Sequence, residues 1–253
     1  MTKTQEVLTF SVALGEAMLQ NGAEIFRVEE TVTLILQAYK LPHFNVYVLS
    51  NGIFASANEG REDACSIIRQ VPLGTVNLAK ISYYNQLSRD VVERRCSIAD
   101  GWKKLSEIHE KRQCQSVELV VGCAMGCGAF CFLQGGTVLD VSVAFGLGIL
   151  IELLLIWMRK QRMVRFVASL FASIMVALAS GLFAIAGMPI SVDKVVISGI
   201  IPLFPGMAFT TSIREFFNAD HLSGVIHLVD ALLTALCIAA GVGIGISVVR
   251  GIR

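Results

Sequence analysis

Four long runs without a charged residue lie in the second half of this 253-residue chain, and they constrain its fold more than any other feature. The runs are residues 119–139, 166–192, 195–213 and 231–249. A helix needs about 20 apolar residues to cross the roughly 30 Å of hydrocarbon in a bilayer. Only 16% of the residues are charged, against about 25% in a typical soluble domain. The pattern excludes an ordinary soluble enzyme and predicts a membrane protein.

The charged residues are distributed unevenly, and this predicts two domains. Residues 1–115 hold 26 of the 41 Asp, Glu, Lys and Arg side chains, and residues 116–253 hold the other 15. We therefore expect a polar head at 1–115 and a transmembrane domain at 116–253. The formal net charge of +1 also argues against nucleic acid as a partner.

Apolar periodicity predicts the secondary structure of the head. Apolar residues have helical spacing in the first and last parts of the head, and in the middle they recur at every second position, as in strands. Asn51-Gly52 is a typical hairpin turn. The expected order is α-α-β-β-β-α-α, an α+β domain. The expected helices are 4–20, 23–39, one after Gly74 and 97–113, and the expected strands are 44–48, 53–57 and 65–71.

The second half is expected to be an α-helical transmembrane bundle of about five spans. The spans are best placed at 116–135, 138–158, 164–187, 194–213 and 222–249. Arg159, Lys160, Arg162 and Arg165 gather between the second and third spans, and basic loops favour the cytoplasmic side. Glu6 and Glu16 interrupt the first apolar stretch, which does not resemble a signal peptide. Both observations predict a cytoplasmic head.

Three cysteines recur every four residues in the first apolar run, at Cys123, Cys127 and Cys131. They share one helix face, where thiolates could hold a soft metal ion. The neighbouring glycines instead indicate small packing residues at a close helix contact. We expect packing, and no metal site.

Residues 21–32, NGAEIFRVEETV, form the most distinctive segment of the head. Glu24, Arg27 and Thr31 fall on one face of the predicted helix. The segment is either an ordinary helix N-terminus, with acidic residues that the helix dipole favours and one surface ion pair, or a functional motif. In the second case its candidate residues are Gly22, Glu24, Arg27, Glu29 and Thr31.

Carboxylates within or beside the apolar runs are candidates for proton transfer. Asp140, Glu152 and Asp230 have this placement, and ionisable groups at such depth are costly unless they face a cavity or a partner. Asp140 follows a Gly-Gly turn and is equally compatible with the membrane interface. Glu152 could instead reach Arg159 at the surface. His227 and Asp230 form an i,i+3 pair that could relay protons or end a helix.

The fourth span contains prolines that break its helix. Pro202 and Pro205 cannot donate backbone hydrogen bonds, Gly206 follows, and Thr210 and Thr211 add hydroxyls. Broken helices inside a bilayer lie where protein or a cavity covers them, and transporters bind substrate carboxylates and ions at such breaks. The alternative is a proline kink satisfied by nearby hydroxyls. We predict a substrate site between Pro205 and Thr211.

The chain resembles the threonine/serine exporter family at four places. They are GAEIFRVEET, the Gly135-Gly136 turn with Asp140, Pro205-Gly206, and Asp220 with Ser223-Gly224. The resemblance covers the whole chain and implies a multi-pass protein of the bacterial inner membrane. Single-chain exporters of this family carry a second membrane block, so this chain looks like the larger subunit of the split form. The resemblance then implies a smaller membrane subunit as partner. It also implies a substrate that is either threonine or serine, or a dicarboxylate such as succinate.

Three functions compete on the sequence alone. The first is a subunit of a proton-coupled secondary exporter of small carboxylate-bearing metabolites, with the head gating the pathway or recognising the substrate. The second is a membrane-anchored enzyme using Glu24, Arg27 and Glu29, although no metal-ligand cluster, phosphate-binding glycine loop or nucleophile elbow accompanies them. The third is a non-transporting assembly subunit. The prediction is the exporter, without enzymatic activity and without a cofactor.

Overall fold

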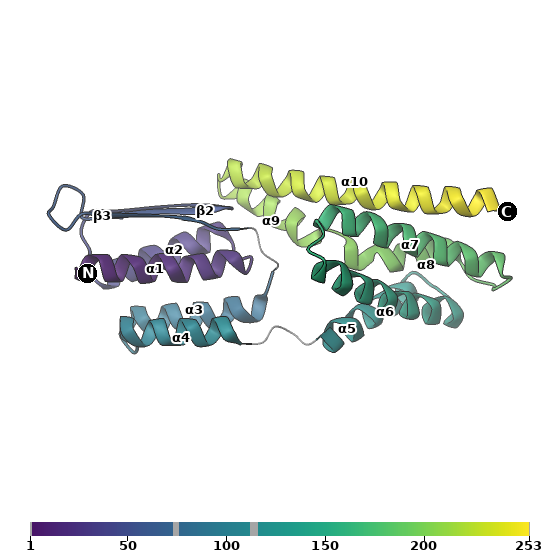
Figure 1. Cartoon of the computed structure of the whole chain (residues 1–253), viewed down its shortest axis with the longest axis horizontal. Coiled ribbons are helices and arrows are strands. Elements are labelled where there is room, and N and C mark those ends of the chain that lie inside the picture. Colours follow the sequence, from purple (N-terminus) through teal and green to yellow (C-terminus); the bar gives the residue numbers. More distant parts are fainter. Residues whose placement is uncertain (1, 73–75, 112–115, 253) are drawn as a thin grey trace. The chain divides into compact units, whose positions relative to one another are not determined.

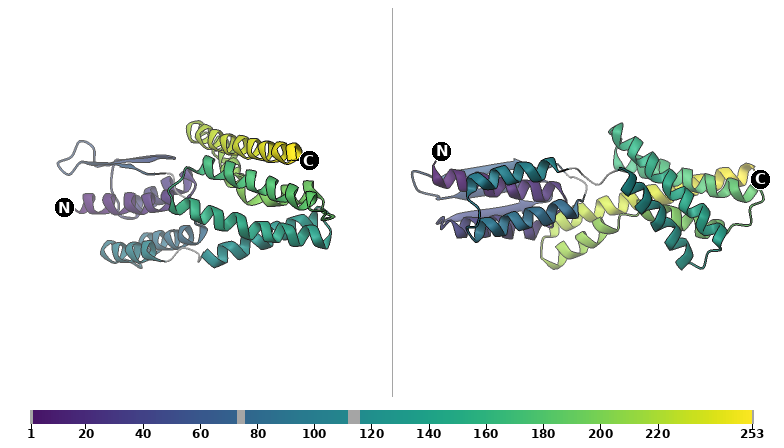
Figure 2. Two further views of the ribbon diagram at one scale, coloured as in Figure 1. Left: turned by 45° about the vertical axis from the view of Figure 1, so that its right-hand side comes forward. Right: turned by 90° about the horizontal axis from the view of Figure 1, so that it is seen from below.

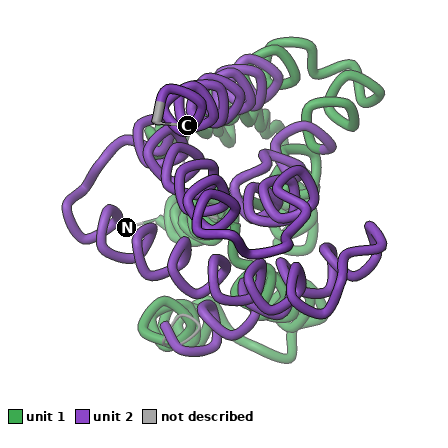
Figure 3. Tube along the Cα trace, turned by 90° about the vertical axis from the view of Figure 1, so that its right-hand side faces the viewer, with its two compact units in different colours: residues 1–113, 211–226 green, residues 114–210, 227–253 purple. Residues whose placement is uncertain are grey.

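The computed structural model describes residues 2–72, 76–111 and 116–252. These form two compact units (Figure 3). One unit combines the head, within residues 1–113, with residues 211–226, and the other combines residues 114–210 with 227–253. The division therefore passes through helix α9 (Gly206–Phe217) and helix α10 (His221–Ile252). The domain boundary predicted at residue 115 lies outside the described residues.

The head has the predicted order α-α-β-β-β-α-α, so its α+β class is confirmed. Its elements are α1 (Lys3–Gln20), α2 (Ile25–Ala38), β1 (Phe44–Leu49), β2 (Gly52–Ala57), β3 (Cys65–Gln70), α3 (Leu78–Val92) and α4 (Ile98–Glu110). They stack in three layers, with the sheet, the α1–α2 pair and the α3–α4 pair in that order (Figures 1 and 2).

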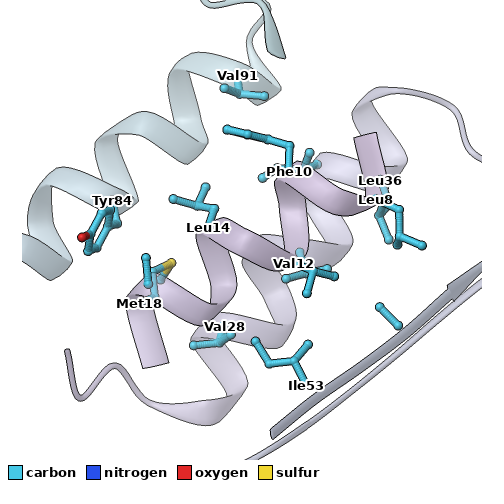
Figure 4. Packing of buried hydrophobic residues seen from close by; sticks show 14 of the residues in the cluster. Leu8, Phe10, Val12, Leu14, Met18, Val28, Leu36, Ile53, Tyr84 and Val91 are labelled. Atoms are coloured by element: carbon cyan, nitrogen blue, oxygen red, sulfur yellow. The ribbon is translucent and has the colours of Figure 1, made fainter. Parts of the chain in front are cut away.

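Helix α1 lies at the centre of the head and is buried on several faces. Leu8, Phe10, Leu14 and Met18 have no exposed surface. Figure 4 shows α1 between α3, which contributes Tyr84 and Val91, and the sheet, which contributes Ile53. An apolar helix of this kind is stable only inside a core, and it forms the platform on which the motif helix α2 packs.

The sheet is antiparallel in the order β1-β2-β3, and its first turn differs from the prediction by one residue. Leu49 pairs with Gly52, so the turn residues are Ser50 and Asn51 rather than Asn51 and Gly52. This register places Val48 opposite Ile53, and both are buried.

Four helices of the described chain are long and apolar enough to cross a membrane, and a bent pair supplies up to a fifth span, as predicted. The four are α5 (Ser116–Leu133), α6 (Val138–Lys160), α7 (Arg165–Ile185) and α10. The bent pair consists of α8 (Val192–Ile200), the 3₁₀ turn η1 (Ile201–Leu203) and α9.

Small residues allow the membrane helices to approach closely. A side chain added at Gly148 of α6 would lie 2.7 Å from Cα of Ala124 on α5. One at Gly199 of α8 would lie 2.7 Å from Val176 on α7. Such contacts replace the hydrophobic effect as the source of helix association in lipid. Cys127 and Cys131 are buried on α5. Among the described residues, no group of three His, Cys, Asp or Glu side chains is arranged to hold a metal ion.

Candidate transport pathway and signature motif

The predicted break in the fourth span is present, and it divides the span into two helices. Helix α8 and the turn η1 end at Leu203, Phe204 is extended, and α9 begins at Gly206 after a bend of 58°. Phe204 precedes Pro205, and the proline ring disfavours the helical conformation in the residue before it. The Thr210 hydroxyl donates to the carbonyls of Gly206 and Met207, at 2.9 and 3.1 Å. Thr210 is exposed and Thr211 is half-buried.

Polar contacts fasten the first half of the broken span to the turn between α5 and α6. Asp140 is fully buried. One of its carboxylate oxygens accepts from the backbone N–H of Ser191, and the other accepts from the backbone N–H and hydroxyl of Thr137. Lys194 donates to the carbonyl of Gly135 at 2.6 Å, and Gln134 donates to the Ser198 hydroxyl at 2.9 Å. These contacts fix the entrance to α8.

The predicted proton-transfer carboxylates do not meet. Asp140 lies in the first turn of α6. Asp230 forms an ion pair with Arg165, with 3.8 Å between Oδ2 of Asp230 and Nη1 of Arg165. Arg165 is the first residue of α7, which follows the other end of α6. At 1.5 Å per residue, the 19 residues from Asp140 to Arg159 span about 29 Å. The two carboxylates therefore occupy opposite ends of the bundle and cannot exchange a proton directly. His227 precedes Asp230 by one helical turn and is half-buried.

Glu152 is both a buried carboxylate within a membrane helix and a partner of Arg159, the two alternatives that the sequence left open. It is buried within α6, only 7% exposed, and forms an ion pair with Arg159, two turns nearer the helix end. Arg159 also donates to the carbonyl of Leu155. The arginine thus extends toward the buried carboxylate, which keeps its charge compensated inside the bundle.

Helix α10 is longer than a bilayer requires, and its ion pair indicates which part crosses. Its 32 residues extend about 48 Å, against roughly 30 Å of hydrocarbon. Asp230 pairs with Arg165 beside the basic α6–α7 turn. The segment after Asp230 reaches about 33 Å at the helical rise and is sufficient to span. A membrane span that begins after Asp230 would leave the first turns of α10 outside the apolar layer.

Residues 21–32, which we call the signature motif, form the connection between α1 and α2 and the first turns of α2. Gly22 has a φ of +80°, and a side chain there would lie 2.8 Å from Val76, so only glycine fits. Glu24 is the N-cap residue of α2, but its side chain makes no capping hydrogen bond. Thr31 is buried against the head. The motif is therefore more than a surface helix start.

Glu24 lies between two arginines. The Arg27 side chain is 3.9 Å away, as the i,i+3 spacing predicts, and Arg214 of α9 forms a second ion pair with it. The Glu24 side chain is 20% exposed, whereas Arg27 is 53% and Arg214 is 60% exposed. A mostly buried carboxylate thus binds two arginines that reach it from different elements.

Residues 211–226 form a helical hairpin that packs closely on itself. The Ser212 hydroxyl on α9 donates to the carbonyl of Gly224 on α10 at 2.8 Å. A side chain added at Gly224 would meet the Phe216 ring at 3.1 Å. Asp220 accepts from the backbone N–H of Ser223 at the start of α10. We call residues 211–226 the α9–α10 hairpin.

A small cavity of about 90 Å³ lies between α2 and the α9–α10 hairpin. Its lining residues are Ile25, Phe26 and Glu29 from α2, and Glu215, Asn218 and Asp220 from the hairpin. Burial raises the pKa of Glu29, and the nearby Asp220 carboxylate raises it further. Both effects disfavour the charged form of Glu29 in the folded protein.

Replacing Glu29 with Gln is expected to give a small rise in melting temperature near neutral pH. A carboxyl group whose folded pKa is raised binds protons more readily in the folded than in the unfolded state. Its unfavourable contribution to stability is therefore lost as pH falls through the raised folded pKa toward the ordinary pKa of a glutamate. Thermal unfolding of the purified chain in detergent at several pH values measures both effects. E29Q should flatten the pH dependence, whereas Glu30→Gln, at an exposed position one residue later, should leave it unchanged.

Sequence reasoning identified the motif but missed its partner. No motif or periodicity in the sequence points to a role for Arg214, Glu215 or Asn218. Their link to α2 spans 190 residues for the Glu24–Arg214 pair, and no periodicity within either segment signals such a contact. The resemblance had included Asp220 and Ser223-Gly224, which lie in the same hairpin.

Comparison with known proteins agrees with this architecture. The family model for threonine/serine exporters (ThrE) matches residues 9–249. A threonine/serine exporter from Corynebacterium glutamicum is 23% identical over 247 residues, which cover 95% of this chain and 50% of the relative. The chain thus spans about half the length of the curated relative it matches. No solved structure matches it significantly. On the match to the family model, the chain belongs to the threonine/serine exporter family.

Proposed function

We propose that this chain is the larger subunit of a two-component secondary exporter of small carboxylate-bearing metabolites, driven by the proton gradient. The observation that carries the proposal is the broken span, in a chain that belongs to an exporter family. A helix interrupted between Leu203 and Gly206 presents the N-terminus of α9, whose backbone N–H groups and dipole favour a carboxylate. The substrate carboxylate would bind between Pro205 and Thr211.

The partner in this proposal is a smaller membrane subunit that supplies further spans. It follows from the resemblance to the split form of the family, and the segment that this chain matches is about half of the curated relative. The substrate is threonine or serine, as the relative's name states for that protein, or a dicarboxylate such as succinate. All three present a carboxylate to the same helix N-terminus.

Orientation and proton coupling complete the proposal. The protein would lie in the bacterial inner membrane with its head in the cytoplasm, since Arg159, Lys160, Arg162 and Arg165 gather at one end of the bundle. Asp230, with His227 one turn before it, would accept the coupling proton at that end. Asp140 would serve the pathway by holding α8, because its carboxylate oxygens accept three hydrogen bonds.

Efflux from preloaded proteoliposomes under an imposed proton gradient tests the proposal. The assay compares threonine, serine and succinate, with this chain alone and with its candidate small partner. We expect efflux of one substrate class only when both chains are present, and loss of the gradient's effect when an uncoupler is added. Absence of efflux for every substrate in both formats would overturn the exporter proposal.

The same assay tests the proton acceptor. Asp230→Asn should abolish the acceleration of efflux by the proton gradient, because an amide cannot take up a proton in this range. Asp193→Asn is the matched control, since Asp193 is exposed at the opposite end of the bundle. Retention of full gradient dependence by D230N would remove Asp230 from the coupling mechanism.

A further inference from the structure

The broken span is divided between the two compact units. The division between units falls between Thr210 and Thr211, within α9. Helix α8 is fastened to the α5–α6 turn by Asp140 and Lys194. The end of α9 is instead fastened to α10 by the Ser212 hydrogen bond and to α2 of the head by Arg214. The broken span therefore starts in the unit of the membrane helices, whereas its last residues, from Thr211 to Phe217, belong to the unit of the head.

The charges at this contact suit the helix ends that carry them. Arg214 lies in the last turn of α9, where the helix dipole favours a cation, and Glu24 lies at the start of α2, where the dipole favours an anion. Because the Glu24 side chain does not cap its own helix, its carboxylate is available to Arg214 and Arg27. The shared cavity lined by Ile25, Phe26 and Asn218 extends the same contact.

We infer that Glu24 and Arg214 are positioning residues for transport: their ion pair holds the α9 half of the broken span on the head in the geometry that efflux requires. The signature motif then acts by placing a helix, and Glu24 neither binds substrate nor catalyses a reaction. The inference rests on the proposed exporter function. Arg27 supports the pair by a second charge beside Glu24, so removing the carboxylate leaves two arginines facing each other.

Charge reversal separates this role from the alternatives. The variants are Glu24→Arg, Arg214→Glu and the double exchange E24R/R214E, reconstituted with the partner subunit in proteoliposomes. Each single reversal is expected to lower the maximal efflux rate by about tenfold, equivalent to about 1.4 kcal/mol in the activation barrier. The half-saturating substrate concentration should stay unchanged, and the double exchange should recover most of the rate. Glu30→Arg, on the same helix and exposed, is the control and should transport normally.

A second measurement on the same samples keeps the outcomes distinct. The melting temperatures of the four proteins in detergent form a double-mutant cycle that reports the ion pair without any transport. Rate recovery by E24R/R214E together with recovered stability supports the inference. A raised half-saturating concentration that the exchange does not restore would overturn it in favour of substrate binding. Single variants that lose stability but keep the rate per folded transporter would also overturn it. If the unaltered proteins show no efflux, the exporter proposal itself fails, while the stability cycle still reports the contact.

Discussion

Replacing Gly241 with alanine is expected to destabilise the membrane domain by about 3 kcal/mol, near the upper end of the range for overpacked sites. A Cβ at this position would overlap the Ser173 hydroxyl oxygen and lie 2.6 Å from the backbone carbonyl oxygen of Leu170, both on α7. The serine side chain can rotate away, but the backbone oxygen cannot. Helices α7 and α10 must therefore separate, and the yield of monodisperse protein should fall sharply.

The same helix offers a matched control. Gly243 lies two residues further along α10, and a side chain there would meet nothing within 4 Å. Gly243→Ala should melt at the temperature of the unaltered protein or slightly above it, since alanine favours a helix over glycine. Because the Leu170 carbonyl remains, Ser173→Ala should fail to rescue G241A. Equal melting temperatures for G241A and G243A in detergent would show that α7 and α10 do not pack at this distance.

Replacing Asp140 with either alanine or asparagine is expected to cost about 3 kcal/mol, since hydrogen bonds to a charged acceptor contribute about 1.5–3 kcal/mol each. Alanine leaves the N–H groups of Thr137 and Ser191 without their acceptor and removes the capping box of α6. Asparagine is hardly better. Each carboxylate oxygen accepts from a backbone N–H, so one of these donors would face the amide NH₂.

This expectation separates two roles for Asp140. If Asp140 holds α8, D140N and D140A should lower the melting temperature by similar amounts. If instead Asp140 carries the coupling proton, D140N should keep its stability and lose only the effect of the proton gradient on efflux. Asp193→Asn provides the control, because that carboxylate is exposed in the first turn of α8 and its loss should change stability by less than about 0.5 kcal/mol.

Most of the fold was predictable because its signals are local. Hydropathy identifies the membrane helices directly, since lipid imposes a minimum length on each apolar run. The break at Pro205 was equally visible, because proline removes a backbone donor wherever it occurs. In the head, apolar periodicity was sufficient for the order of helices and strands. The hairpin turn was misplaced by one residue because Asn51-Gly52 favours a turn locally, while the pairing of buried Val48 and Ile53 outweighs that preference.

The functional residues were only partly predictable. Gly22, Glu24 and Arg27 could be selected from the motif itself, and the i,i+3 pair was expected. The role of Asp140 as an acceptor for Ser191, 51 residues away, could not be derived, because the turn that supplies Ser191 carries no polarity pattern of its own. For the same reason the separation of Asp140 from Asp230 became visible only when the ends of α6 were known.

The sequence by itself determined the division into a polar head and apolar spans, the helical break in the fourth span and the family of the chain. These depend on composition, spacing and proline chemistry, which act within a few residues. Only the tertiary structure decided that Glu24 pairs with Arg214, that Asp140 anchors α8, and that the end of α9 belongs with the head. Such contacts depend on the packing of distant segments, and the free energy that selects them comes from burial and charge pairing across the fold rather than from any one segment.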